Sequence, residues 1–246
     1  MGLRRGMTRQ ARPHVQLVHA CSPSVVPWRD ARRVARALQR QVREHFGPPY
    51  GVEATVEAVP RGRHDARAWQ VVLADDAEGA AADGWHELTA HGLPLGKVYA
   101  KDVIAECGGW SSTASHEVLE LLADPDMSLA VLVYGPRGSR LFAYEVCDPV
   151  QDDRYAYSIG GVRVSDFVYP TWFESFRAVR SARFDYAGVC DRPLQVLAGG
   201  YAQVTHAHYE RGWRDEGPAR GKRGPARGSR RARRRTARST WRVSAR

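Results

Sequence analysis

Residues 110–125 read WSSTASHEVLELLADP, and this stretch sets the arrangement of the rest of the chain. Hydroxyl side chains at positions 111–113 can accept hydrogen bonds from the free N–H groups of a first helical turn. At the other end, Asp124-Pro125 disfavours continuation of a helix. The stretch therefore predicts a helix over residues 112–123, entered through a turn at Cys107-Gly108-Gly109.

The polar residues of this predicted helix fall on one side of it. At about 100° per residue, His116 and Glu120 lie about 40° apart, and Glu117 lies beside them. An imidazole nitrogen and a carboxylate four residues later can hold zinc or another divalent metal between them. Glu117 is then placed as a general base, as in the HExxH helix of zinc proteases with the second His replaced by Glu. The opposite arc is apolar: Val118, Leu119, Leu121 and Leu122.

Two ligands are too few to retain a metal ion, so a third ligand is expected further along the chain. Glu145, in the sequence YEVCD that ends at Asp148, is the first choice. Asp148 is the second choice, either as a ligand or as the outer-shell acceptor that orients His116.

Other interpretations of these residues remain open. A polar arc on an amphipathic helix is often a solvated surface. His86 and His91 precede a predicted strand, and His86 either faces the metal or a substrate carbonyl or is a loop residue. Ser115 lies in no GxSxG motif and is not predicted to be a nucleophile. Calcium is an alternative ion for a set of acids whose spacing matches no EF-hand loop: Asp124, Asp126, Asp148, Asp152 and Asp153.

Hydrophobic periodicity around the central helix predicts the order β-α-β-β-β-α followed by a mostly irregular carboxyl-terminal half. We therefore expect an α/β (α+β) fold, a mixed twisted sheet with two main helices. The first helix is predicted over residues 27–46, where Gly47-Pro48-Pro49 stops it. The strands are predicted at residues 14–20, 52–58, 69–74, 97–104 and 141–147.

Charge divides the chain into three parts. The net charge is +10, but residues 211–246 hold 14 of the 37 Lys and Arg residues and two of the 27 acids, so the rest of the chain has a net charge of −2. We expect a flexible amino terminus over 1–13, one domain over 14–210, and an Arg-rich disordered tail over 211–246. The tail either binds nucleic acid through its phosphates, without base specificity, or has no specific function.

Neither a signal peptide nor a membrane span is expected, because no apolar run is long enough. The sequence thus predicts a cytoplasmic protein with no membrane partner. Its four cysteines form no CxxC pair and are expected to be reduced, small buried residues: Cys21, Cys107, Cys147 and Cys190. Phosphate-binding P-loops and dinucleotide-binding GxGxxG motifs do not occur.

Several stretches resemble a family of uncharacterised bacterial and phage-associated proteins with the signature SHExxExxxDP … ExxD … VSDFVxPxWF. The stretches that carry the resemblance are 110–125, 144–148 (YEVCD), 161–173 (GVRVSDFVYPTWF), 85–89 (WHELT) and 94–98 (PLGKV). The resemblance covers residues 15–205. More distantly, the paired motifs are similar to those of Exordium-type proteins and zincin metallopeptidases. The resemblance implies a zincin-like domain and supplies no demonstrated activity.

Two functions are therefore expected as alternatives. The first is a metal-dependent, peptidase-like hydrolase, in which Glu117 activates a metal-bound water against a protein or peptide substrate. The second is a non-catalytic binding module that keeps the zincin scaffold, with a basic tail that binds nucleic acid.

Overall fold

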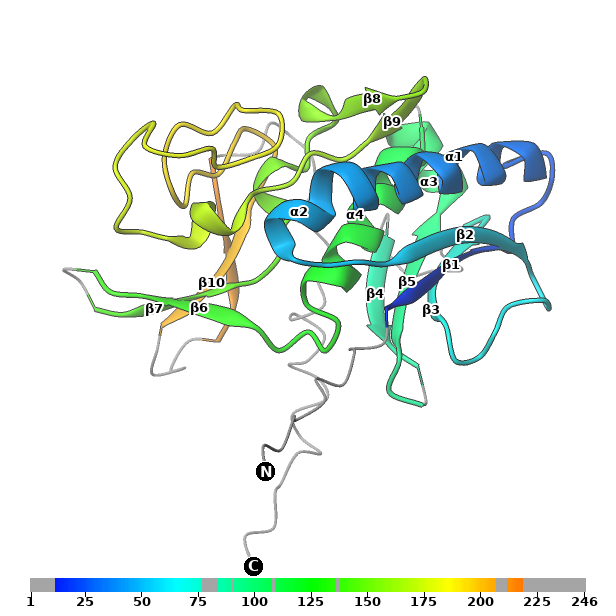
Figure 1. Ribbon diagram of the computed structural model, residues 1–246, viewed down its shortest axis with the longest axis horizontal. Coiled ribbons are helices and arrows are strands. Elements are labelled where there is room, and N and C mark those ends of the chain that lie inside the picture. The colour runs from blue at the N-terminus through cyan, green and yellow to red at the C-terminus, as the bar shows by residue number, and fades with distance from the viewer. Residues whose placement is uncertain are drawn as a thin grey trace, which may run out of the picture.

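The amino-terminal half of the protein is built on a five-stranded sheet, called sheet A here (Figure 1). The computed structural model describes residues 12–76, 84–89, 91–107, 109–135, 138–206 and 212–218. The strand order is β2-β1-β3-β5-β4. Four strands are parallel and β4 runs antiparallel to β5 at the edge. The strands are β1 (His14–His19), β2 (Thr55–Pro60), β3 (Trp69–Ala74), β4 (Gly84–Leu88) and β5 (Pro94–Tyr99).

The first helix covers sheet A and continues past its predicted end. Helix α1 (Trp28–Gln41) passes into a π-helical turn, Val42–Phe46, and then into α2 (Gly47–Tyr50). The expected stop at Gly47-Pro48-Pro49 is therefore wrong. Proline is tolerated in a first helical turn because its missing N–H would have no partner there, and Pro48 and Pro49 lie at the start of α2. The helix ends instead at Gly51, whose φ of 65° is left-handed.

Two further predictions near the centre of the chain need correction. The strand expected at 97–104 stops at Tyr99, and the chain turns into α3 (Ala100–Cys107). There the Lys101 amide donates to the Asp75 carbonyl at 2.8 Å, and Asp102 lies in the first turn, where a carboxylate is favoured. Strand β4 was not predicted, because GWHEL lacks the alternation of apolar and polar residues that marks a strand.

The central helix, α4 (Ser111–Ala123), lies between sheet A and a second, four-stranded sheet, called sheet B (Figure 1). Sheet B has the order β11-β10-β7-β6, with all pairs antiparallel. The strand predicted at 141–147 is shorter than expected and ends at Ala143. The mixed α/β (α+β) class is confirmed. The strands are β6 (Ala130–Val133), β7 (Arg140–Ala143), β10 (Ala202–His206) and β11 (Arg214–Glu216).

The predicted domain boundary at residue 210 is too early. Strand β11 pairs with β10, with Arg214 opposite Val204, so the fold includes residues that the sequence assigned to the tail. The remainder of the tail from residue 219, and residues 1–11 of the predicted flexible terminus, lie outside the described residues.

The segment between β7 and β10 has little regular structure, as expected. It contains the hairpin β8 (Tyr157–Ile159) and β9 (Val162–Val164) and three short 3-10 helices, Asp148–Val150, Asp153–Tyr155 and Pro170–Phe173. Large buried aromatic side chains fix this segment against α1 and sheet B: Phe46, Phe167, Trp172 and Phe184. Packing of buried aromatic side chains, more than regular secondary structure, holds this segment in its conformation.

Two buried carboxyl groups also hold the irregular segment. Both Asp166 and Asp185 are almost fully buried. The Asp185 oxygens accept hydrogen bonds from the amides of Val189 and Cys190, each at 2.9 Å. Burial, followed by the proximity of Asp185, raises the pKa of Asp166 to about 8. Asp166 therefore keeps a proton at neutral pH and can share it with Asp185.

We expect Asp166→Asn to remove part of the pH dependence of folding stability. Because an unfolded aspartate has a pKa near 3.9, the contribution of Asp166 is present below pH 4 and is lost as pH rises towards 8. Relative to the wild type, Asp166→Asn should gain about 1 kcal/mol or more of unfolding free energy between pH 5 and pH 9. Urea unfolding at a series of pH values measures this.

The matched control is Asp185→Asn. Its new NH2 group would face the amide donors of Val189 or Cys190, so this variant should lose stability at every pH. Equal behaviour of the two variants would show that the proton does not reside on Asp166.

Candidate metal centre

Helix α4 is buried on nearly every side, including the side that carries its acids. Glu117 and Glu120 are only 4% and 2% exposed, and the His116 side chain is 15% exposed. A solvated polar arc, one of the alternatives from the sequence, is therefore wrong. The helix ends where Asp124 accepts hydrogen bonds from the amides of Ser128 and Leu129.

The side chains predicted to share an ion lie together. His116 Nε2 is 3.2 Å from Glu120 Oε1, one turn further along α4. It is also 3.4 Å from Asp148 Oδ1, at the start of the 3-10 helix Asp148–Val150. Three groups from two distant stretches of the chain thus converge at one buried point, as the sequence predicted for His116, Glu120 and its second-choice partner Asp148.

Cys147 is a member of this cluster that the sequence did not predict. One donor atom each from His116, Glu120 and Cys147 can be chosen so that all lie within 4.8 Å of one another. The Cys147 amide also donates to Glu120 Oε1 at 3.3 Å. The sequence predicts only a small buried residue at Cys147, since no second cysteine is near it in sequence. The available signal was its position beside Asp148.

Glu145, the first choice for the third ligand, lies close to Cys147 in sequence and is buried. Among the described residues, the group that can hold an ion contains Cys147 and does not contain Glu145. A role for Glu145 as a ligand stays a prediction.

The charges of the cluster partly offset one another in the absence of an ion. Burial alone would lower the pKa of His116, but Glu120 and Asp148 outweigh burial and raise this pKa well above its usual value. Burial raises the pKa of Glu120 as well. A protonated His116 between two carboxylates is therefore one stable state of the cluster, and a divalent cation in place of that proton is another.

Glu117 lies beside the cluster with a different environment. Burial raises its pKa to about 7. Its Cβ lies close to Gly96 of β5, where an added Cβ would be 3.4 Å from it. Gly96 of β5 is near Glu117, and His86 of the edge strand β4 is paired with Gly96. Glu117 therefore lies under the β4–β5 edge of sheet A. His91, the other histidine considered, is exposed.

Tyr201 is a second residue that the sequence did not associate with the site. Burial raises its pKa well above the usual value, and Asp148 and Glu120 raise it further. Its side chain hydrogen-bonds Asp148, and its amide donates to the Asp148 carbonyl at 3.0 Å. Tyr201 thus fixes Asp148 in position. Asp148 faces Nε2 of His116, the same ring nitrogen that faces Glu120, so its position is that of a ligand and not of an outer-shell acceptor, which would bind the other ring nitrogen.

Ser115 has a structural role, in line with the prediction that it is no nucleophile. Its hydroxyl donates to Gln41 Oε1 at 2.7 Å and accepts from the Ser165 amide at 3.0 Å. Gln41 Nε2 in turn donates to the Ser165 carbonyl at 2.9 Å. This buried network fixes α4 against α1, and so fixes the direction of His116.

The acids considered as calcium ligands serve other purposes. Asp152 caps the 3-10 helix Asp153–Tyr155, and Asp153 accepts a hydrogen bond from Ser112 at 2.7 Å. With Asp124 capping the end of α4, these oxygens hold the backbone in place. No cluster of three acids occurs among the described residues, so the structure gives calcium no support.

Comparisons with protein-family models, with curated proteins and with solved structures each return no match to this chain. In the described part of the chain, no helix has both the length and the apolar character needed to cross a membrane.

Proposed function

We propose that this protein is a metal-dependent hydrolase whose ion is held by His116, Glu120 and a ligand from the segment 145–148. The observation that supports the proposal most is the convergence of His116, Glu120 and Cys147 at a buried point beside Glu117, a carboxyl group with a pKa of about 7. Perturbed titratable groups that gather in this way mark functional sites more often than ordinary surfaces do.

The donor set suits zinc. Zinc accepts imidazole nitrogen, carboxylate oxygen and cysteine sulfur, usually four ligands in a tetrahedral arrangement. All three donor types are present, and oxygen-preferring ions such as calcium would gain nothing from the nitrogen and sulfur atoms. Burial keeps the Cys147 thiol pKa well above its usual value, so the thiol is protonated when no cation is near.

Different residues would hold the metal ion and transfer the proton. When bound, such an ion lowers the pKa of water and polarises a substrate carbonyl. Glu117 lies outside the ligand group and, with a pKa near neutrality, can take a proton from water and return it to the leaving group. Asp148, held by Tyr201, lies on the same side of the His116 ring as Glu120 and is available as a further ligand. We propose in addition that the substrate is a protein or peptide and that the domain is zincin-like.

We expect Glu117→Gln to retain the metal and to lose hydrolysis. The amide keeps the size of Glu117 but cannot accept the proton, and loss of a general base costs about 100-fold to 10,000-fold in rate. Zinc content and turnover of a peptide library, measured on the same preparations, test this. Metal loss in Glu117→Gln would make Glu117 a ligand, and unchanged turnover would remove it from the mechanism.

The second candidate function is a non-catalytic binding module. It is favoured by one observation, the pairing of a protonated His116 with Glu120 and Asp148, which needs no ion. A metal-free protein that takes up no added zinc would support the module and contradict the hydrolase.

The remaining partners are proposed from the sequence. A cytoplasmic location agrees with three free, buried cysteines at positions 21, 147 and 190. Binding of nucleic acid by the Arg-rich tail is proposed on its charge alone, and it should weaken steeply with salt.

A further inference from the structure

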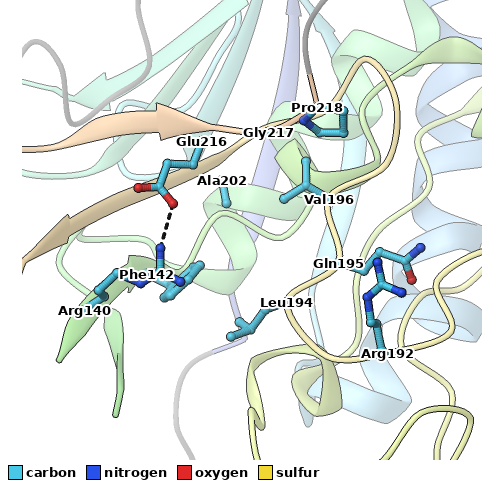
Figure 2. Close-up of a pocket in the computed structure, with 10 residues that line it drawn as sticks. All are labelled: Arg140, Phe142, Arg192, Leu194, Gln195, Val196, Ala202, Glu216, Gly217 and Pro218. Carbon is cyan, nitrogen blue, oxygen red and sulfur yellow. Dashed lines mark hydrogen bonds and ion pairs between the residues drawn. The ribbon is translucent and has the colours of Figure 1, made fainter. Parts of the chain in front are cut away.

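A cavity of about 280 Å³ lies on the face of sheet B that carries Phe142 and Ala202 (Figure 2). None of the residues that line it belongs to the metal cluster. Its rim includes Gly217 and Pro218, which follow β11. The hydrolase proposal does not use this cavity.

The middle of the cavity is apolar. Figure 2 shows Leu194, Val196 and Ala202 between two polar ends. The Phe142 ring lies nearby and is itself fixed edge-on against Trp172, at 6.5 Å between ring centres. Apolar surface of this kind binds an aliphatic or aromatic group and fits a small ligand, because the volume is near the lower limit of ligand pockets.

One end of the cavity offers hydrogen-bond donors. Arg192 and Gln195 both line the cavity there (Figure 2). The side-chain oxygen of Gln195 already accepts from the Asp191 amide at 2.8 Å, so the NH2 group is what Gln195 can offer a ligand. The Arg192 guanidinium is 3.7 Å from Asp191 Oδ1, too far for a direct hydrogen bond. A guanidinium beside an amide NH2 suits a carboxylate.

The opposite end is occupied by an internal ion pair. Arg140 Nη1 is 2.8 Å from Glu216 Oε2, and the guanidinium of Arg140 lies over the Phe142 ring at 5.0 Å. Arg140 therefore already has a direct hydrogen bond to a carboxylate, whereas Arg192 is held to Asp191 only by a longer ion pair of 3.7 Å, so the N–H groups of Arg192 are better placed to donate to an incoming anion. A phosphate carries up to two negative charges and would meet only one arginine at this end. The single charge of a carboxylate is offset by one guanidinium.

The wall between the ends is preformed. Leu194 has a φ of 57°, a left-handed conformation that is uncommon for a leucine. Its amide donates to the Trp172 carbonyl at 2.9 Å, and Trp172 Nε1 donates to the Gln195 carbonyl at 2.8 Å. Because these bonds hold an unfavourable backbone in place, a ligand meets a rigid surface and little ordering is needed on binding.

We propose that this cavity binds a carboxylate joined to an apolar group, with the carboxylate at Arg192 and Gln195 and the apolar group against Leu194, Val196 and Ala202. Two sources share this chemistry, the carboxyl-terminal residue of a peptide and a free apolar acid.

Calorimetric titration of the full chain tests the proposal with three probes, N-acetyl-L-phenylalanine, its carboxamide and octanoate. At least one of the two acids should bind saturably, and the carboxamide should bind at least tenfold more weakly than N-acetyl-L-phenylalanine if the latter binds. Binding of N-acetyl-L-phenylalanine alone identifies a chain terminus as the source, and binding of octanoate alone identifies a free acid. Saturable binding of neither acid overturns the proposal, as does equal binding of the carboxamide.

Arg192→Gln should weaken acid binding about tenfold, the effect of one charged hydrogen bond. Arg177→Gln is its matched control, because Arg177 lies in the same irregular segment, pairs with Glu174, and does not line the cavity. Ala202→Leu should fill the cavity and abolish binding of both acids. Unchanged binding in Arg192→Gln, or equal losses in Arg192→Gln and Arg177→Gln, would overturn the assignment even if Ala202→Leu fails to fold.

Discussion

His116→Ala is expected to abolish stoichiometric metal binding and to make thermal unfolding insensitive to a chelator. The imidazole is the only nitrogen donor in the described cluster, and the other donors cannot replace it. In the wild type, a ligand at 100 times its dissociation constant adds about 2.7 kcal/mol to stability, so chelation should lower Tm by several degrees. The same chelator should leave the Tm of His116→Ala unchanged.

The comparison with chelator matters because His116→Ala should lower Tm for a second reason. Removing the imidazole leaves Glu120 and Asp148 facing each other in a buried place, which is destabilising with or without an ion. Tm alone therefore cannot identify a metal ligand. His91→Ala, at an exposed position, is the control and should keep both the metal and the chelator response.

The third ligand can be assigned with the same measurements. Cys147→Ser and Glu145→Gln change one donor each while keeping side-chain size. The variant that loses zinc identifies the third ligand. If Cys147 and Glu145 can substitute for each other, either variant should lose less zinc than His116→Ala does. Full zinc retention by His116→Ala would show that this cluster does not hold the metal. His116, Glu120 and Asp148 would then be a buried ion-pair network with a structural role.

The sequence predicts the centre of this molecule well, for a local reason. The helix at 112–123 follows from the spacing of its apolar residues and from Pro125, and the closeness of His116 and Glu120 follows from their spacing of four positions, about one helical turn. Both are properties of one helix. They depend on hydrogen bonds between residues close in sequence, so they can be predicted without knowing the tertiary contacts.

Features that depend on distant parts of the chain were harder to predict. The contact of Cys147 with Glu120 spans 27 positions and exists only because the segment that follows β7 returns to α4. Strand β4 pairs with β5 although its own residues show no strand pattern, because an edge strand needs hydrogen bonds from one side only. In each case tertiary contact decided what local pattern could not.

The short helix α2 shows a third kind of limit. Prolines usually end a helix, so Pro48 and Pro49 predict a stop at this point. The π-helical turn before them shifts the backbone so that they enter a new first turn. Gly47 permits this shift, since an added Cβ would lie 2.6 Å from the Val52 carbonyl oxygen. A side chain at position 47 would therefore force the chain to turn elsewhere.

The irregular half of the protein should depend heavily on one side chain, Trp172. It is only 1% exposed, and its ring meets Phe142 of sheet B and Phe173 at centre distances of 6.5 Å and 4.9 Å. Its indole N–H donates to the Gln195 carbonyl, and its own carbonyl accepts from Leu194. One residue thus joins sheet B to the segment that closes the molecule.

We expect Trp172→Ala to lower the unfolding free energy by about 3–5 kcal/mol, the cost of a large cavity in a packed core. Trp172→Phe keeps most of the buried ring and loses the hydrogen bond to Gln195, so it should cost less, about 1 kcal/mol for the bond plus the smaller volume. Phe176→Ala, at a side chain that is 81% exposed, should change stability by less than about 0.5 kcal/mol. Urea unfolding of the three variants measures this order. A loss in Trp172→Ala no greater than that in Phe176→Ala would mean that the segment from residue 170 to 195 does not unfold together with sheet B, and that the two halves are held by other contacts.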